Sequence, residues 1–287
     1  MKKLLVVLCC ILALQSCNNG NTGTETVNGF DINWSGNLNK NEQAAIKDMI
    51  SNMVKVEAGT FYMGAQKDSV EYYNYDESAT SWESPVHEVT VSEFYINKYE
   101  VTQALWKAVM GKHNDKKDEF DQWEDEFGKG DNYPAYRISF NEVETFIGKL
   151  NEYTGLNFAL PTEAQWEYAA RGGANTNYAL YAGGDDVIEF AWIDENSDKC
   201  SEIGKKNPNT LGLYDMSGNV WEMCQDWYYD YTADAVTNPV GEAYNEGLKV
   251  FRGGSWNNKA QQARVTARYK QGIHYRDYNT GFRLVLE

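Results

Sequence analysis

Four stretches of the chain place apolar residues at the three-to-four spacing of an amphipathic helix. The clearest is residues 139–153, where Ser139 and Glu142 have the spacing of a capping box and Gly155 follows the last apolar turn. Three more helices are expected from the same signals: residues 41–53, residues 102–110 before Gly111, and residues 162–171 before the glycine pair 172–173.

Alternation of apolar and polar residues predicts strands elsewhere in the chain. The longer ones are residues 54–64 and 86–96, and a polar, acidic surface loop is expected between them. Beyond residue 173 the chain is rich in glycine and asparagine, and the strand candidates are short: residues 249–252 and 282–286. The pattern predicts one α+β domain with few helices, short strands and much ordered coil.

The segment Asn207–Tyr228, NPNTLGLYDMSGNVWEMCQDWY, has neither periodicity. Its glycines suit backbone positions with positive φ, and its tyrosines and tryptophans supply apolar surface. Asp215 and Glu222, with main-chain carbonyls between them, are hard oxygen donors of the kind that Ca²⁺ collects. The alternative is that both carboxylates cap local turns without any metal.

This segment also carries a family resemblance. The run GLYDMSGNVWEM resembles the signature of the formylglycine-generating enzyme (sulfatase-modifying factor) family. Five further motifs follow the family's order: Met53–Gly64 (MVKVEAGTFYMG), Tyr95–Gly111 (YINKYEVTQALWKAVMG), Leu160–Gly173 (LPTEAQWEYAARGG), Phe251–Trp256 (FRGGSW) and Gly281–Val285 (GFRLV). The resemblance implies a C-type-lectin-like fold over residues 41–287. It also implies a structural calcium ion held by Asp215, the carbonyls of Gly218 and Val220, and Glu222.

The amino terminus has the pattern of an export signal. Two lysines precede an apolar run at residues 4–14, which is too short to span a bilayer. The following Leu14-Gln15-Ser16-Cys17 resembles a bacterial lipobox, so residues 1–16 are expected to be a lipoprotein signal peptide and Cys17 the lipidated residue. An ordinary signal with a small-residue cleavage site is the alternative. Residues 17–40 are then a flexible tether to the cell envelope, at the outer membrane or cell surface.

The chain is strongly acidic. Removing residues 1–16 takes away two lysines and no acid, which changes the formal charge from −16 to −18. Such a surface repels phosphate backbones, so no nucleic-acid partner is expected.

Cysteine positions argue against the family's oxidase chemistry. Formylglycine-generating enzymes use two copper-binding cysteines, three and eight residues beyond the serine of the Gly-Gly-Ser motif. Counting from Ser255 gives Asn258 and Ala263, neither of which supplies the sulfur that Cu(I) prefers, so copper is not expected. Cys200 and Cys224 lie elsewhere and form either one disulfide or two free thiols. The histidines (His87, His113 and His274) lack the spacing of an iron site.

Helix 162–171 contains a possible acid–base pair. Glu163, Glu167 and Arg171 follow one another at four-residue steps, which is more simply an exposed ion-pair ladder than a catalytic arrangement.

Residues 255–281 have the composition of a recognition surface, rich in Asn, Gln, Arg and Tyr. This segment resembles the variable ends of lectin-fold proteins diversified by retroelements, which share the RGGSW…GFR frame. The candidate binding residues are Trp256, Asn257, Asn258, Lys259, Gln261, Gln262, Arg264, Tyr269, Lys270, His274, Tyr275 and Tyr278. The alternative is an ordinary solvated surface whose arginines, Arg252, Arg264, Arg268 and Arg283, pair with structural acids.

Three functions are compatible with the sequence. The expected one is a non-catalytic lipoprotein that binds a protein or another surface ligand, or that acts as an envelope scaffold. The others are an enzyme of the sulfatase-modifying factor family and a structural subunit of a gliding or secretion machine of the envelope.

Overall fold

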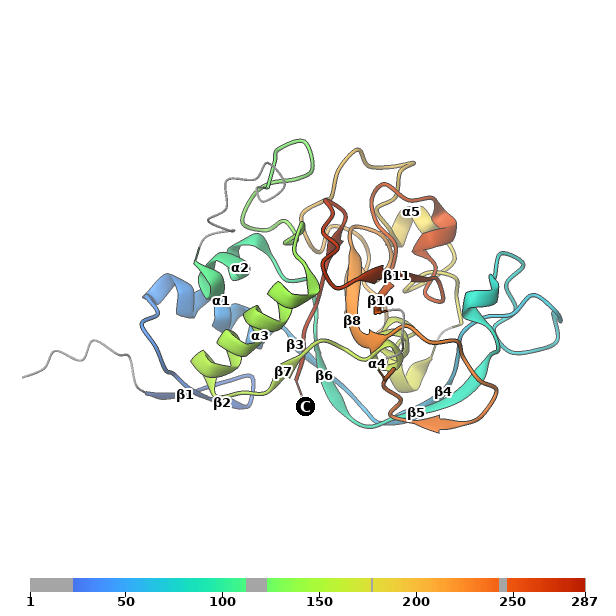
Figure 1. Cartoon of the computed structure of the whole chain (residues 1–287), viewed down its shortest axis with the longest axis horizontal. Helices are drawn as coiled ribbons and strands as arrows, with labels where there is room; N and C mark the ends of the chain where they lie inside the picture. The colour runs from blue at the N-terminus through green and yellow to red at the C-terminus, as the bar shows by residue number, and fades with distance from the viewer. Residues whose placement is uncertain (1–22, 112–122, 177, 243–246, 287) are drawn as a thin grey trace, which may run out of the picture.

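The computed structural model describes residues 23–111, 123–176, 178–242 and 247–286. In this part of the chain the structure is α+β, with short strands and long stretches of coil, as the sequence predicts (Figure 1). The α-helices are α1 (Lys40–Ser51), α2 (Gln103–Met110), α3 (Phe140–Thr154), α4 (Glu163–Ala170) and α5 (Val187–Phe190). The 3₁₀ turns are η1 (Ser81–Glu83), η3 (Gly173–Asn175) and η4 (Ala260–Ala263).

The four predicted helices are confirmed, although α1 ends at Ser51 and Met53, its predicted last residue, begins β3. Thr102 caps α2 by accepting from the Leu105 amide, and Gly111 ends that helix. The predicted capping boxes are present at the starts of α3 and α4. These local hydrogen bonds satisfy amides that have no partner inside the helix, so the helix starts could be predicted from sequence.

The strands form four small sheets. Their orders are β1-β2, β11-β10-β8-β12, β3-β6-β13-β7 and β4-β5-β9. The strands of the two larger sheets are β11 (Arg268–Gly272), β10 (Leu248–Arg252), β8 (Trp221–Trp227), β12 (Thr280–Gly281), β3 (Met53–Val56), β6 (Phe94–Asn97), β13 (Val285–Leu286) and β7 (Phe158–Ala159). The others are β1 (Thr24–Val27), β2 (Phe30–Asn33), β4 (Gly59–Met63), β5 (His87–Val91) and β9 (Val236–Thr237).

The prediction of continuous strands at 54–64, 86–96 and 282–286 is wrong. Residues 54–64 are divided between β3 and β4, and residues 86–96 between β5 and β6, so that each run supplies strands to two different sheets. At the carboxy terminus only β13 is a strand within 282–286. Apolar alternation continues through each break because both halves are buried, which hides the break from a pattern of hydrophobicity.

The amino-terminal region is more ordered than a tether. The hairpin β1-β2 lies within the predicted tether, residues 17–40, and Ile32 and Trp34 are buried in the core. The tether prediction is therefore wrong for its second half. Cys17 and the predicted signal peptide lie outside the described residues. Among the described residues, the structure contains no helix with the length and hydropathy of a transmembrane span.

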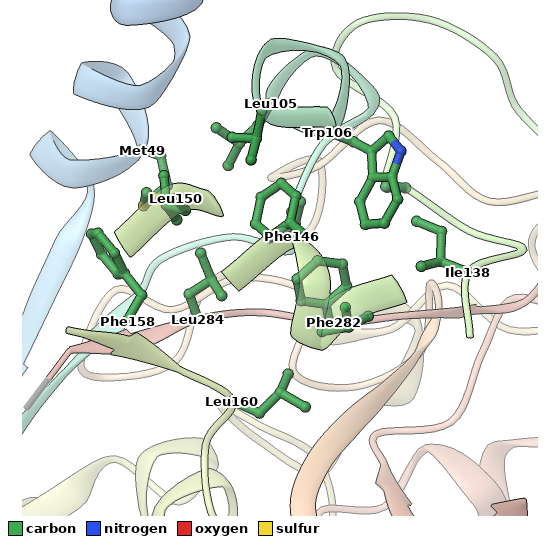
Figure 2. Packing of buried hydrophobic residues seen from close by; sticks show 14 of the residues in the cluster. Met49, Leu105, Trp106, Ile138, Phe146, Leu150, Phe158, Leu160, Phe282 and Leu284 are labelled. Atoms are coloured by element: carbon green, nitrogen blue, oxygen red, sulfur yellow. The ribbon is translucent and has the colours of Figure 1, made fainter. Parts of the chain in front are cut away.

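One core of buried apolar residues joins α1, α2 and α3 to the carboxy-terminal segment. Figure 2 shows side chains of α2 and α3 meeting those of the carboxy-terminal segment, with Trp106 and Phe146 beside Phe282. The Trp106 and Phe146 rings stack with centroids 5.2 Å apart, and Phe282 meets both edge-on. This packing fixes the GFRLV segment, and with it Arg283, in the interior.

Helix α4 lies inside the molecule. All eight of its residues are buried, and it contacts strands of two sheets, β4 and β5 on one side and β8 and β10 on the other. Its acids therefore need partners in the interior.

Candidate functional site

The site is built around the coil that leads into β8. Asp215, Gly218 and Asn219 all have positive φ, at 57°, 77° and 60°. At Gly218 a Cβ atom would lie 2.1 Å from the carbonyl oxygen of Trp192, so only glycine fits this close approach. The irregular backbone that the sequence predicts is thus present, held against residue 192.

Asp215 has the features of a cation ligand. Its side chain is 2% exposed, and its Oδ2 accepts from the Gly204 amide at 2.7 Å. Its Oδ1 is buried and has no hydrogen-bond partner. Burial, above all, raises the pKa of Asp215 to about 6. A buried carboxylate oxygen with no partner fits the donor set of a calcium ion.

Glu222 is held differently. Arg283 donates to both of its oxygens, through Nη2 to Oε1 and Nε to Oε2, each at 2.6 Å. The Trp166 indole donates to Oε2 at 2.8 Å. Oε1 accepts a single hydrogen bond here and keeps a lone pair, so Glu222 can still contribute one oxygen to a cation, although its charge is already paired.

Glu100 is the acid that sequence reasoning missed. It is 2% exposed, its Oε2 accepts from the Asn219 side chain at 2.7 Å, and its Oε1 accepts from the Val220 amide at 3.3 Å. Burial, followed by the charges of Asp215 and Glu222, raises the pKa of Glu100 well above its usual value. Its position inside the YEVT motif was the only signal in the sequence.

Three buried carboxyl groups therefore surround one guanidinium. Glu100, Asp215 and Glu222 interact electrostatically with one another and with Arg283. This excess of negative charge is compatible with a further cation, completed by the carbonyls of Gly218 and Val220. In the part of the chain that the structure describes, no three His, Cys, Asp or Glu side chains converge closely enough to hold a metal by themselves.

Asn258 and Ala263, the two positions matched to the family's catalytic cysteines, both lie beside residues 191–194. The Asn258 carbonyl accepts from the Asp194 amide at 3.1 Å, and Ala263 is buried against Ala191 and Ile193. The Asn258 side chain accepts from the Ser255 hydroxyl. Neither position carries sulfur.

The two described cysteines are free and buried. Cys200 donates to the Phe127 carbonyl at 2.8 Å, and Cys224 lies in strand β8. Burial raises the pKa of both thiols, which disfavours the thiolate that a nucleophilic reaction needs at neutral pH.

The predicted binding residues divide by exposure. Lys259, Gln261, Gln262 and His274 are exposed. A second group is half-buried: Asn257, Asn258, Tyr269, Lys270, Tyr275 and Tyr278. Trp256 and Arg264 are buried, at 8% and 3% exposure, so their assignment to an exposed face is wrong.

Ring contacts fix the tyrosines of this segment. Tyr278 stacks on Phe127 with centroids 4.5 Å apart, and Tyr269 stacks on Trp221 at 5.2 Å. Trp256 supports Tyr278 from inside, at 5.7 Å. The tyrosines are therefore rigid while the amides beside them reach solvent.

The predicted exposed ladder on α4 is also wrong. Glu163, Glu167 and Arg171 are at most 3% exposed. Arg252 donates to Glu163 at 2.8 Å and to Glu167 at 2.6 Å. Arg268 donates to both oxygens of Glu163, from Nε at 2.6 Å and from Nη2 at 2.8 Å. The structural interpretation of Glu163 and Glu167 is confirmed, because both carboxylates pair with buried arginines.

Arg264 also forms ion pairs with buried acids. It pairs with Asp76, and its Nη1 and Nη2 donate to the two oxygens of Glu83 at 2.8 and 3.0 Å. All four arginines of the alternative interpretation, Arg252, Arg264, Arg268 and Arg283, thus pair with buried acids.

Comparisons with known proteins agree with this architecture. A 30% identical relative is the chaperone protein LppX of Paenibacillus barcinonensis, matched over 62% of this chain and 74% of LppX. The formylglycine-generating enzyme of Streptomyces coelicolor is 30% identical over 53% of this chain and 52% of that enzyme. The serine/threonine-protein kinase pkn1 of Chlamydia pneumoniae is 27% identical over 84% of this chain, which spans 39% of the kinase.

Two solved structures match most of the chain. Treponema denticola variable protein 1 superposes with a TM-score of 0.69 at 26% identity, covering 92% of this chain and 98% of that one. PvdO from Pseudomonas aeruginosa superposes with a TM-score of 0.68 at 25% identity, covering 82% and 94%. The fold is therefore the C-type-lectin-like fold of the formylglycine-generating enzymes. A model of the sulfatase-modifying factor enzyme 1-like domain matches residues 38–287, and the chain belongs to that family.

Proposed function

We propose that this protein is a non-catalytic, membrane-anchored binding or scaffolding domain of the cell envelope. The observation that carries the proposal is the pair of positions beside residues 191–194. Asn258 and Ala263 supply no sulfur there, and the described thiols are buried elsewhere. Without sulfur at these two positions, the copper ion that the oxidation of a substrate cysteine requires has no thiolate ligands there.

The binding role is supported by the surface of the Trp256–Tyr278 segment. Stacked tyrosines give contact area at a low cost in conformational entropy, and the exposed amides of Gln261 and Gln262 give hydrogen-bonding groups. One relative is named a chaperone and one structural neighbour a variable protein. The name chaperone is in keeping with a binding role, whereas the relatives named formylglycine-generating enzyme are in keeping with the enzyme alternative.

Anchoring and calcium complete the proposal. Cys17 carries the lipid that holds the protein to the envelope, and a calcium ion bound by Asp215, the Gly218 and Val220 carbonyls and Glu222 fixes the coil before β8. The partnerless Oδ1 of Asp215 supports that ion.

The first experiment tests catalysis directly. A peptide with a Cys-x-Pro-x-Arg sequence is incubated aerobically with residues 18–287, with and without copper, and its mass is measured beside an active family member. We expect an unchanged cysteine. Conversion to formylglycine would overturn the proposal and establish the alternative of a divergent enzyme.

A second experiment tests the binding face in the full-length protein in cells. Photo-crosslinking from position 262 is compared with crosslinking from Ile188, which is exposed on α5 outside the segment. We expect a discrete partner band from position 262 that is lost in the variant Asn257→Ala with Tyr278→Ala. Equal patterns from both positions would contradict a binding role for this face, and a band shared with a large envelope complex would favour the machine-subunit alternative.

A further inference from the structure

Exposed aromatic residues gather on a different part of the surface. Of the nine large hydrophobic side chains exposed in the described ranges, seven come from residues 70–82 and 178–180. Tyr72 is 72% exposed, Tyr73 55%, Tyr178 46% and Tyr75 40%. Isolated exposed apolar groups are ordinary, whereas a concentration of this kind marks an interaction site.

Contacts connect most of these rings through Tyr62, and Tyr72 is the chain neighbour of Tyr73. Tyr73 stacks on Tyr62 with centroids 3.9 Å apart and planes 10° apart. The Tyr62 amide donates to the Tyr178 hydroxyl at 3.5 Å, and Tyr75 and Tyr178 line the same small depression. We call the five residues Tyr62, Tyr72, Tyr73, Tyr75 and Tyr178 the tyrosine surface.

The loop between β4 and β5, which carries most of this surface, is held to the interior of the protein by ion pairs and hydrogen bonds. Arg264 pairs with Asp76 and Glu83, and both acids are at most 9% exposed. Arg268 donates to the Trp82 carbonyl at 2.8 Å. Gln66 is buried, and its side chain bonds the backbone of residues 68 and 69. The rings are thus presented by a fixed loop, which lowers the entropy lost on binding.

The charge around the rings selects the partner. Three exposed acids of this loop, Asp68, Glu71 and Glu77, accompany its single exposed base, Lys67. A fourth exposed acid, Glu88, lies on β5, and its charge acts on Tyr62. This charge repels nucleic acids and anionic lipid. It also disfavours a second copy of the chain, whose formal charge is −16. Only a cationic partner gains from both the rings and the acids.

We propose that the tyrosine surface binds a basic segment of another protein, whose arginine and lysine side chains lie over the exposed rings beside the four acids. The chain already uses this contact internally. The Arg171 guanidinium lies 5.2 Å from the Tyr178 ring centroid, and Lys270 lies 4.2 Å from that of Tyr228. Cation–π contact with Tyr, together with neighbouring carboxylates, recognises such a segment without a deep pocket. This site is separate from the Trp256–Tyr278 segment and stands whether or not that segment binds anything.

The test uses random dodecapeptides displayed on phage, selected on the protein without its signal sequence. Selected peptides should contain more Arg and Lys, and fewer Asp and Glu, than the starting library. A synthetic peptide of the selected sequence should bind Tyr72→Ser with Tyr73→Ser at least about fivefold more weakly than wild type. The variant Glu71→Gln with Glu77→Gln should weaken binding and reduce its dependence on salt.

The matched control is Ile188→Ser, which removes a side chain of 47% exposure outside the tyrosine surface. It should leave the affinity within about twofold, a change typical of positions outside a hot spot. Selected peptides without an excess of basic residues would overturn the proposal, as would unchanged affinity in the tyrosine double variant. Binding of neutral dextran in place of peptides, or dimerisation lost in the double variant, would identify a different occupant and would also overturn it.

Discussion

Two sets of side chains in residues 255–281 have opposite environments. Arg264 and Arg268 are at most 6% exposed, and each is held by acids from distant segments. Lys259, Gln261 and Gln262, only a few residues away, face solvent. A polar composition therefore does not identify a recognition surface. The arginines of this segment hold the fold together, and only the remaining polar groups are available to a partner.

The largest effect is expected from the buried set. Arg252→Met leaves Glu163 and Glu167 without one of their cations, and breaking a buried ion pair costs about 3–5 kcal/mol of unfolding free energy. Urea unfolding followed by fluorescence measures it. A loss below about 1 kcal/mol would mean that Arg171 and Arg268 are enough to neutralise the two acids. The buried and exposed sets would then differ less in their contribution to stability than their burial suggests.

Calcium removal should have the next largest effect. If an ion is bound at Asp215, a chelator should lower the melting temperature, because a ligand present at 100 times its Kd adds about 2.7 kcal/mol to the native state. The response should vanish in Asp215→Asn and persist in Asp226→Asn, a carboxylate that accepts from two backbone amides. An unchanged melting temperature, in protein first shown by elemental analysis to contain calcium, would contradict the calcium site.

A pH effect should distinguish Asp226 from the paired acids. Burial, followed by the charge of Glu163, raises the pKa of Asp226 to about 6. The folded state then holds its proton more tightly than the unfolded chain, so this residue's contribution to stability is complete below about pH 4 and lost as the pH rises through about 6.

The wild-type advantage over Asp226→Asn should therefore shrink between those pH values, by on the order of 2 kcal/mol. Urea unfolding of both proteins at a series of pH values measures it. An advantage that grows with pH would show that the carboxylate, rather than the acid, is the stable form in the folded protein.

The smallest effect is expected from the exposed set. Gln262→Ala removes a side chain at the surface and should change the unfolding free energy by no more than about 0.5 kcal/mol. The same urea titration checks it. A cost near that of Arg252→Met would remove the contrast between the two sets.

The sequence anticipated some burial correctly and some wrongly, for a physical reason. In α3 most of the apolar residues at helical spacing are buried, so the periodicity identified the face that packs on the core, although the polar Thr154 is buried as well. In α4 every residue is buried, including the charged ones. Charged residues on a helix normally face solvent, so Glu163 and Glu167 were expected to be exposed. Glu100 was missed because a single acid beside a predicted strand has no periodic signal.

By itself, the sequence determined the helix starts, the α+β class, the family and the irregular backbone before β8, because capping hydrogen bonds, apolar periodicity and glycine requirements act between near neighbours. Only the tertiary structure decided which charges are buried. Arg252 meets Glu163 across 89 residues of sequence, and Arg264 meets Glu83 across 181. Burial of a charge depends on whether a partner arrives from elsewhere in the fold to replace water, and no local pattern records that arrival.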